Sequence, residues 1–145
     1  MGGRYAEVFA GGSRDAVVAC GGDKATGPGA VSGNYSLRTV NGNNVPAVFF
    51  QDTQEKDEIV SGNINIVADN TWNGTFALRG TDLTSSNVIN VNVPIGGTYS
   101  LSGGTITLTD APNQLTLTGT IGSGTLALGS DAFVLGETTA LVFRK

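Results

Sequence analysis

The stretch from Thr98 to Leu128, TYSLSGGTITLTDAPNQLTLTGTIGSGTLAL, alternates aliphatic or aromatic residues with Thr and Ser and is interrupted by small turn clusters. An alternation with a period of two places successive side chains on opposite faces of a strand. Strands with one face toward a core and one toward water are typical of antiparallel sheets. The stretch therefore predicts an all-β fold built from short hairpins.

The same pattern continues on both sides of this stretch and predicts about nine to eleven short strands from Gly33 onward, with no room for helical crossovers. Short connections make sequence neighbours pair in the sheet, which favours an antiparallel up-and-down (meander) β-barrel without exposed edges. A two-sheet β-sandwich is the alternative. The predicted details include a charged loop at Asp52–Glu58, a bulge at Ser61–Gly62, a turn at Pro94–Gly97, and separate strands at Thr125–Gly129 and Ala132–Leu135.

Composition narrows the class of protein. The chain has 145 residues, 22 of them Gly, and only 14% are charged, against about 25% in an average soluble protein. This length suits one domain with its own core. The net charge of −4 argues against nucleic acid as a partner, because nucleic-acid binding relies on clustered Lys and Arg.

The chain has no histidine and a single cysteine, Cys20. It therefore lacks the commonest general base and zinc ligand, and one cysteine makes no internal disulfide. No apolar stretch approaches the roughly 20 residues that a membrane-spanning helix needs. No cofactor is predicted, and nothing in the sequence supports enzymatic activity, although it does not exclude it.

Residues 1–32 show no sustained alternation and contain repeated Gly pairs, which predicts a flexible N-terminal tail before a barrel domain at 33–145. Within the tail, Val17 to Gly22 (VVACGG) resembles the lipobox of bacterial lipoproteins, in which the cysteine is lipidated. The match is degenerate, because Arg14 and Asp15 interrupt the apolar segment that an export signal requires. A tail with an incidental Cys20, or an added strand in this region, are the alternatives.

A series of short motifs from Ser32 to Lys145 resembles the bacterial lipocalin-like domains found on small envelope lipoproteins. It begins with a G-x-Y strand that leads into a VNG-x-x-V-P hairpin. The motifs follow one another in the order that such domains show: Gly33-Asn34-Tyr35, Val40-Asn41-Gly42, Val45-Pro46, Asp69-Asn70-Thr71-Trp72, Gly97-Thr98-Tyr99 and Leu141-Val142-Phe143-Arg144-Lys145. The sequence departs from lipocalins in having Tyr35 where Trp is usual and in lacking further lipocalin signatures, which leaves the ligand unassigned.

The resemblance implies a structural role for two residues. In lipocalins an arginine on the last strand packs across the aromatic residue of the first motif and closes one end of the barrel. By position these residues are Arg144 and Tyr35, and a guanidinium is well suited to stack on a ring. The alternative is that Arg144 is a solvated terminal residue.

Inward-facing residues of an eight-stranded barrel are the natural lining of a small ligand site. Most residues of inward parity are expected to be core. The candidate ligand-binding residues are two strand arginines suited to an anionic group, together with apolar and aromatic side chains: Arg38, Phe50, Phe76, Leu78, Arg79 and Tyr99.

The segment Gln51 to Glu58 gathers four carboxylates, at Asp52, Glu55, Asp57 and Glu58. Such clusters suit calcium or, as pairs, glycoside hydrolysis, but the spacing matches no defined motif. A solvated charged loop is the plainest interpretation, and the four residues are weak candidates for a metal site.

Three functions follow as hypotheses. The first is a noncatalytic lipocalin-like barrel of the bacterial cell envelope or periplasm that binds a small apolar or amphipathic ligand, with membrane attachment only through a lipid on Cys20. The second is a self-assembling structural or adhesive protein that uses strand addition. The third is a small carboxylate-dependent hydrolase.

Overall fold

The computed structural model describes residues 28–134 and 136–145. The predicted leader segment and Cys20 lie outside the described residues. The described chain forms one helical turn and ten strands: α1 (Pro28–Val31), β1 (Gly33–Val40), β2 (Asn43–Asn44), β3 (Ala47–Gln51), β4 (Glu55–Ile66), β5 (Thr71–Asp82), β6 (Val88–Ser102), β7 (Thr105–Asp110), β8 (Leu115–Gly122), β9 (Thr125–Val134) and β10 (Glu137–Arg144).

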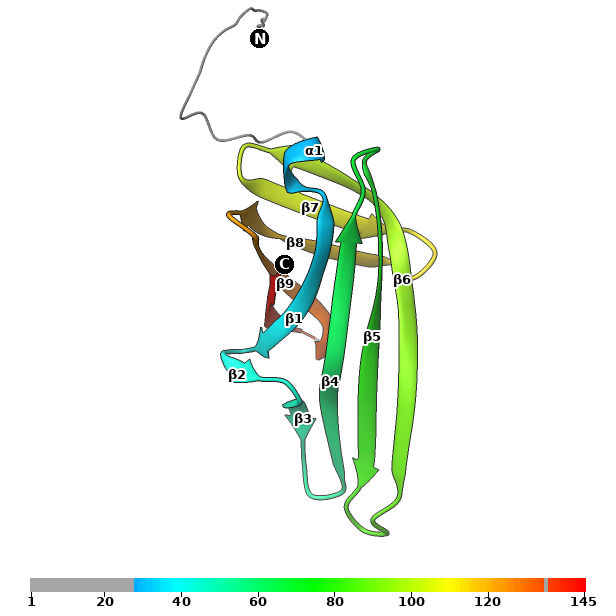
Figure 1. The fold of residues 1–145 in the computed structure, drawn as a ribbon. Helices are drawn as coiled ribbons and strands as arrows, with labels where there is room; N and C mark the ends of the chain where they lie inside the picture. The colour runs from blue at the N-terminus through cyan, green and yellow to red at the C-terminus, as the bar shows by residue number, and fades with distance from the viewer. Residues whose placement is uncertain (1–27, 135) are drawn as a thin grey trace, which may run out of the picture.

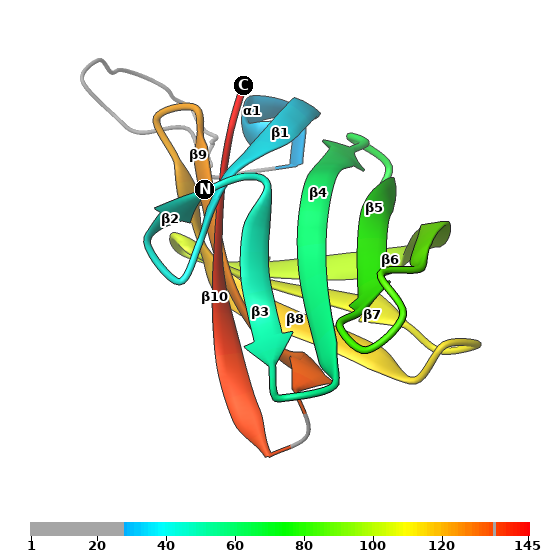
Figure 2. The same ribbon diagram turned by 90° about the horizontal axis from the view of Figure 1, so that it is seen from below.

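The strands form a closed antiparallel barrel of eight strands with up-and-down topology, which confirms the predicted fold class over the sandwich. Strands β4 to β10 pair in sequence order, β10 pairs with β1, and β1 returns to β4 with Gly33 opposite Ile66. Strands β2 and β3 lie outside this ring, on β1 and β4 respectively. Figures 1 and 2 show β7 and β8 running across the far side of the barrel from β4 and β5.

The turn residues explain the first hairpin. Asn41 and Gly42 have φ values of 52° and 85°, and they join β1 to β2. Positive φ at both central residues is the requirement of the tight hairpin turn that an Asn-Gly pair favours. A bulge forms in β4 just before the predicted position Ser61–Gly62, because the register between β4 and β5 shifts between Ile59 and Ser61.

Three predicted details are wrong. Residues 55–58 belong to β4, so only the first part of the expected charged loop is a turn. Residues 94–97 do not form a turn but lie within the continuous strand β6, and the two strands expected between residues 125 and 135 are one strand, β9. In each case pairing with a neighbouring strand extends the β-structure through residues that favour turns in isolation.

Strand β6 changes partner in its middle. It pairs with β5 up to Thr98, and Thr98 is also the first residue that pairs with β7. A Cβ at Gly97 would collide with the Thr109 carbonyl, so only glycine permits this close approach. The Trp72 indole N–H donates to the same Thr109 carbonyl at 3.2 Å and joins β5 to β7 at this corner.

One end of the barrel is closed by α1, which lies at the upper end in Figure 1. Its last residue, Val31, is buried, and the Val31 carbonyl accepts a 2.6 Å hydrogen bond from the buried Tyr35 hydroxyl. Trp72 is also fully buried in the core. Among the described residues, no helix is of the length and apolarity needed to cross a membrane.

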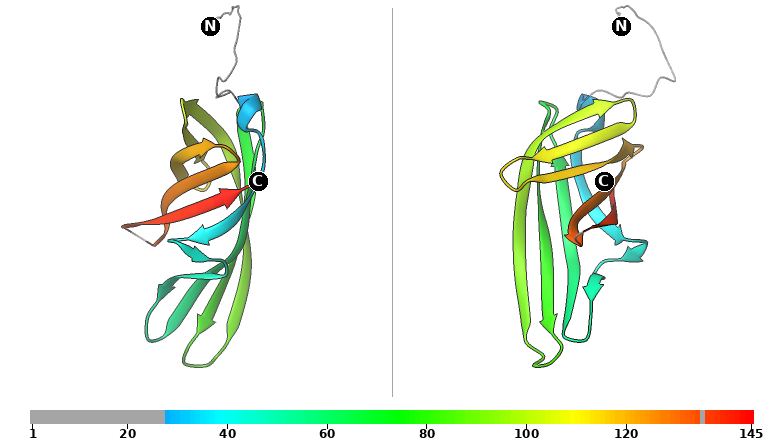
Figure 3. Two further views of the ribbon diagram at one scale, coloured as in Figure 1. Left: turned by 60° about the vertical axis from the view of Figure 1, so that its left-hand side comes forward. Right: turned by 180° about the vertical axis from the view of Figure 1, so that it is seen from behind.

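At the other end, three strands extend past the ring. The lower halves of β4, β5 and β6 project together with β3, as Figures 1 and 3 show. We call this four-stranded extension, residues 47–51, 55–60, 77–82 and 88–94, the tongue. Because the hairpins of β7 to β10 do not extend as far, the tongue leaves one side of this end of the barrel open.

Candidate functional site at the open end of the barrel

A cavity of about 290 Å³ lies where the tongue leaves the barrel. Its walls come from β5 and β6 on one side and from β8, β9 and the β7–β8 turn on the other. They are almost entirely apolar: Phe76, Leu78, Val93, Ile95, Asn113, Leu115, Leu117, Ala132 and Phe133. The volume is close to the lower end of the range of about 300–1,000 Å³ that is typical of small-ligand pockets.

Aromatic rings separate this cavity from the packed core. The Phe76 ring meets Phe133 edge-on at a centroid distance of 5.4 Å and lies 6.2 Å from Phe143, which is fully buried. Phe133 also contacts Phe49 of β3 at 5.5 Å. Edge-to-face and tilted arrangements are the favourable ones for such rings. The four rings therefore form one aromatic cluster contributed by four different strands, and two of them, Phe76 and Phe133, line the cavity.

The position of Phe76 depends on a glycine opposite to it. Gly62 of β4 pairs with Phe76, and a Cβ at Gly62 would lie 2.7 Å from the Phe76 ring. Since real Cβ atoms do not approach so closely, the absence of a side chain at residue 62 is what allows the ring to lie flat across β4.

A second hollow of about 320 Å³ continues from the cavity along the inner face of the tongue. Leu78 lines both, and Phe49, Ile89 and Val91 provide the rest of the apolar lining. The Asp57 carboxylate lies over Gly80, with an oxygen 3.2 Å from the place of a Cβ there. The inner face of the tongue is therefore apolar near the barrel and becomes acidic toward its tip.

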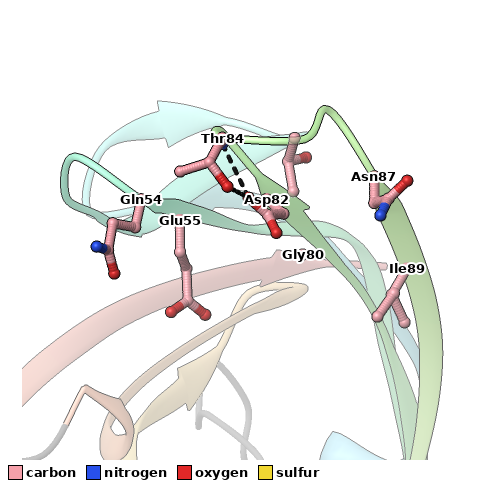
Figure 4. Close-up of a pocket in the computed structure, with 8 residues that line it drawn as sticks. Gln54, Glu55, Gly80, Asp82, Thr84, Asn87 and Ile89 are labelled. Carbon is pink, nitrogen blue, oxygen red and sulfur yellow. Dashed lines mark hydrogen bonds between the residues drawn. The ribbon is translucent and has the colours of Figure 1, made fainter.

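The tip itself holds an open hollow of about 550 Å³, shown in Figure 4. Asp82 lies here, and its carboxylate accepts hydrogen bonds from the Thr84 N–H and hydroxyl at 2.8 and 2.6 Å and from the Ser85 N–H at 3.2 Å. These donors, the Thr84 hydroxyl most strongly, lower the pKa of Asp82 to about 2. Its carboxylate is thus engaged in holding the β5–β6 turn.

Of the four carboxylates predicted as a cluster, Asp52, Glu55 and Asp57 lie close enough to affect one another, whereas Glu58 is paired with Arg79. Asp52 accepts hydrogen bonds from the backbone of Gln54 and Glu55 and forms the β3–β4 turn. The negative charge of Asp57 raises the pKa of Glu55. In the part of the chain that the structure describes, no group of three or more acidic, His or Cys side chains is arranged to hold a metal ion.

Glu58 and Arg79 form an ion pair directly across β4 and β5, with the Arg79 Nε 2.8 Å from Glu58 Oε1. The hydrogen bond from Arg79 lowers the pKa of Glu58. Because side chains alternate along a strand, Arg79 points to the face of the tongue opposite Leu78. Arg79 borders the second hollow, but its charge is balanced within the sheet by Glu58, and it does not line the cavity.

The structure brings two of the six candidate ligand-binding residues, Phe76 and Leu78, to the cavity. Arg38 is exposed on β1, and Phe50 is exposed on β3. Tyr99 is buried and donates its hydroxyl to the Val67 carbonyl at 2.7 Å, near the closed end.

Sequence reasoning missed several cavity residues. Val93 and Ile95 lay in or beside a segment taken as a turn, and Phe133 lay in a short strand assigned separately. Val93 and Ile95 continue the alternation that includes Val91, and this alternation runs unbroken along β6. It could have identified both residues as facing the same side as Val91. Leu115 and Asn113 line the cavity because β8 lies opposite β6 across the barrel. Neither sequence segment by itself indicates this arrangement.

The cation over the Tyr35 ring is Lys145, whose Nζ lies 5.5 Å from the ring centroid. Arg144 is exposed and reaches the Thr125 hydroxyl at 3.4 Å. The structure therefore does not show the predicted contact of Arg144 with Tyr35. The next residue, Lys145, makes the contact instead. The reason is that Arg144 pairs with Ser36 on the outer face of the barrel. Burial raises the pKa of Tyr35, which keeps its hydroxyl a donor to Val31.

Comparisons with known proteins returned no match: neither a family model, nor a curated protein, nor a solved structure resembles this chain significantly. The barrel architecture is compatible with the lipocalin-like fold that the sequence motifs imply. The pairing of the strands alone establishes the barrel.

Proposed function

We propose that this protein is a noncatalytic binding barrel that takes up a small apolar or amphipathic molecule at its open end. The observation that carries this proposal is the cavity of about 290 Å³, in which Asn113 is the single polar residue among nine lining residues. Pockets of this kind gain affinity mainly from burying apolar ligand surface, at about 25 cal/mol per Å².

The expected affinity is modest. Burying about 200 Å² of apolar ligand surface contributes about 5 kcal/mol, and the loss of translational and rotational freedom opposes it. We expect dissociation constants on the order of a millimolar for a single-chain amphiphile.

The charges around the cavity favour some head groups of a bound amphiphile over others. A chain longer than the cavity extends past Leu78 into the second hollow, where Asp57 lies beside Arg79, whose charge is already paired with Glu58; Glu55 follows at the tip. Carboxylates disfavour a second negative charge nearby. We therefore propose that neutral or cationic amphiphiles bind better than anionic ones.

The test is a titration of ¹⁵N-labelled full chain with decanol, decanoate and decylamine, followed by two-dimensional NMR. We expect saturable shifts of the amide signals of Phe76, Leu117 and Phe133, with decanoate the weakest of the three ligands. Shifts that are scattered over the surface or do not saturate would contradict a cavity site.

A pair of matched variants separates the cavity from the rest of the surface. Ala132→Trp places a large ring in the cavity mouth and is expected to weaken binding at least tenfold. Ala140→Trp makes the same change at an exposed residue of the same hairpin that does not line the cavity, and should bind like wild type. Equal binding by both variants would overturn the proposal.

We further propose that the protein resides in the bacterial cell envelope and is anchored by a lipid on Cys20. The support is the VVACGG segment at residues 17–22 and the lipocalin-like motifs. Mass spectrometry of the membrane fraction from the native host tests this directly. A mature protein that still carries residues before Cys20, without an added lipid, would exclude the anchor.

A further inference from the structure

The tongue has two border strands, β3 and the first part of β6, and in the described chain the outer side of this part of β6 is unpaired. The first part of β6, residues 88–94, pairs with β5, whereas its pairing with β7 begins only at Thr98. Within residues 28–134 and 136–145, no strand lies along the outer side of this segment. Figures 1 and 3 show it as one border of the tongue, below the β7–β8 turn.

The hydrogen bonds of the neighbouring turn show which backbone groups face outward. The Asn87 carbonyl accepts from the Asp82 N–H at 2.8 Å and therefore points toward β5. Backbone groups two residues apart on a strand point the same way, so those of Ile89 and Val91 also face β5. The N–H and C=O groups of Val88, Asn90 and Asn92 consequently face outward.

Two residues at the end of the segment agree with this alternation of outward-facing and inward-facing backbone groups. The N–H of Gly96 points away from β5 and donates to Asp110 Oδ2 at 3.0 Å. Pro94 stands at an outward position, where its missing N–H removes no bond to β5. The free edge therefore runs from Val88 to Asn92, and Pro94 ends it.

Three side chains of this edge, those of Val88, Ile89 and Val91, are apolar and exposed, and none of its five side chains is charged. Val88, Ile89 and Val91 are 52%, 67% and 47% exposed. From Leu83 to Thr109 the chain has no charged residue. Natural sheets usually protect an open edge with lysine, a bulge or a covering segment, and this edge has only Pro94 at one end.

We propose that this edge is a strand-addition surface on which a second copy of the chain pairs antiparallel through the same residues. With Asn90 opposite Asn90 of the second copy, Val88 lies opposite Asn92. Each outward N–H then finds a carbonyl on the other copy. Ile89 and Val91 form cross-strand apolar pairs on the inner face.

A second copy fits better than other partners because the edge is complementary to itself about a two-fold axis. The neutral sequence avoids the like-charge repulsion that two identical charged edges would suffer. The contact is narrow, so the dimer is expected to be weak and to depend on concentration.

Sedimentation velocity of the full chain from micromolar to millimolar concentration tests the proposal. We expect a monomer–dimer equilibrium, with protection of the Val88, Asn90 and Asn92 amides from hydrogen exchange that increases with concentration. A monomer at every concentration would refute it. A series of larger polymers would also refute it, because a two-fold contact closes at the dimer.

Two variants locate the contact. Asn90→Pro removes an outward N–H without removing a bond to β5 and should raise the dissociation constant at least tenfold. Asn90→Thr keeps the backbone donor and should dimerise like wild type. If Asn90→Pro does not fold, Val91→Lys provides the same test by introducing repulsion between the two copies. A dimer that neither Asn90→Pro nor Val91→Lys weakens would place the interface elsewhere.

Discussion

The carboxylate of Asp110 accepts a hydrogen bond from the backbone N–H of Gly96 at 3.0 Å, and so ties β6 to the end of β7 where the two strands are no longer paired. Asp110 is only 2% exposed and also accepts from the Asn113 N–H and side-chain amide at 3.2 and 2.7 Å. This one carboxylate fixes the end of the free edge of β6 and the turn that borders the cavity.

We expect Asp110→Ala to lower the melting temperature by several degrees, because it leaves N–H groups in a largely buried place without an acceptor. Asp110→Asn keeps one acceptor oxygen and should be intermediate. Asp131→Ala, the same change at an exposed residue of β9, serves as the control and should be neutral. Thermal unfolding followed by circular dichroism measures all three, and an unchanged melting temperature for Asp110→Ala would contradict the assigned role.

Gly62→Ala is expected to destabilise the protein by about 1–3 kcal/mol, because the new methyl group meets the Phe76 ring at 2.7 Å. If the ring moves aside, it moves into the cavity, and decanol binding should weaken as well. Gly122→Ala is the matched control, since nothing lies within 4 Å of its Cβ position. Urea unfolding and the NMR titration provide the two readouts.

The low pKa of Asp82 predicts a dependence of stability on pH. Because its pKa is about 2 in the folded protein, against the ordinary 3.8, ionised Asp82 stabilises the fold above pH 4. This contribution is lost as the pH falls from about 4 through 2. Asp82→Asn should therefore be less stable than wild type at pH 6, and the difference should shrink by pH 2. Urea midpoints measured across this range test the prediction, and a difference that grows on acidification would show that the sign is wrong.

The contact between Lys145 and Tyr35 predicts an asymmetry between the last two residues. Lys145→Ala should destabilise the fold by about 0.5–1 kcal/mol, because it removes the cation over the ring. Arg144→Ala should have a smaller effect, since its side chain reaches only the Thr125 hydroxyl on the surface. A larger loss for Arg144→Ala would instead support the arrangement that the lipocalin resemblance implies.

Much of the fold was predictable because its signal is local. The alternation around Ile106 and Leu117 identifies strands, and Asn41-Gly42 identifies a hairpin turn, since both depend on neighbours along the chain. The continuity of β6 through Pro94 and Gly97 was not predictable in this way. Those residues favour turns by themselves, and only pairing with β5 holds them in a strand.

The candidate site was predictable in part. Phe76 and Leu78 share a parity that the sequence displays, and both line the cavity. Arg79 was an equally good candidate for ligand binding from the sequence. Its partner Glu58 lies 21 residues away, and the two residues meet only through the register of β4 with β5. Phe133 joins the cavity wall because β9 runs on past its pairing with β8, which no local pattern records.

The sequence by itself determined that this chain forms antiparallel hairpins with a Thr-rich face toward water, because a period of two and turn-forming residues act over a few positions. The tertiary structure alone decided that Val31 and Lys145 are the partners of Tyr35 at the closed end, that a cavity opens beside Phe76, and that the edge from Val88 to Asn92 is left unpaired. These features follow from the different lengths and registers of strands that are distant in the chain. The cavity and the free edge both lie where the tongue extends past the barrel, because strands of unequal length leave apolar groups without neighbours.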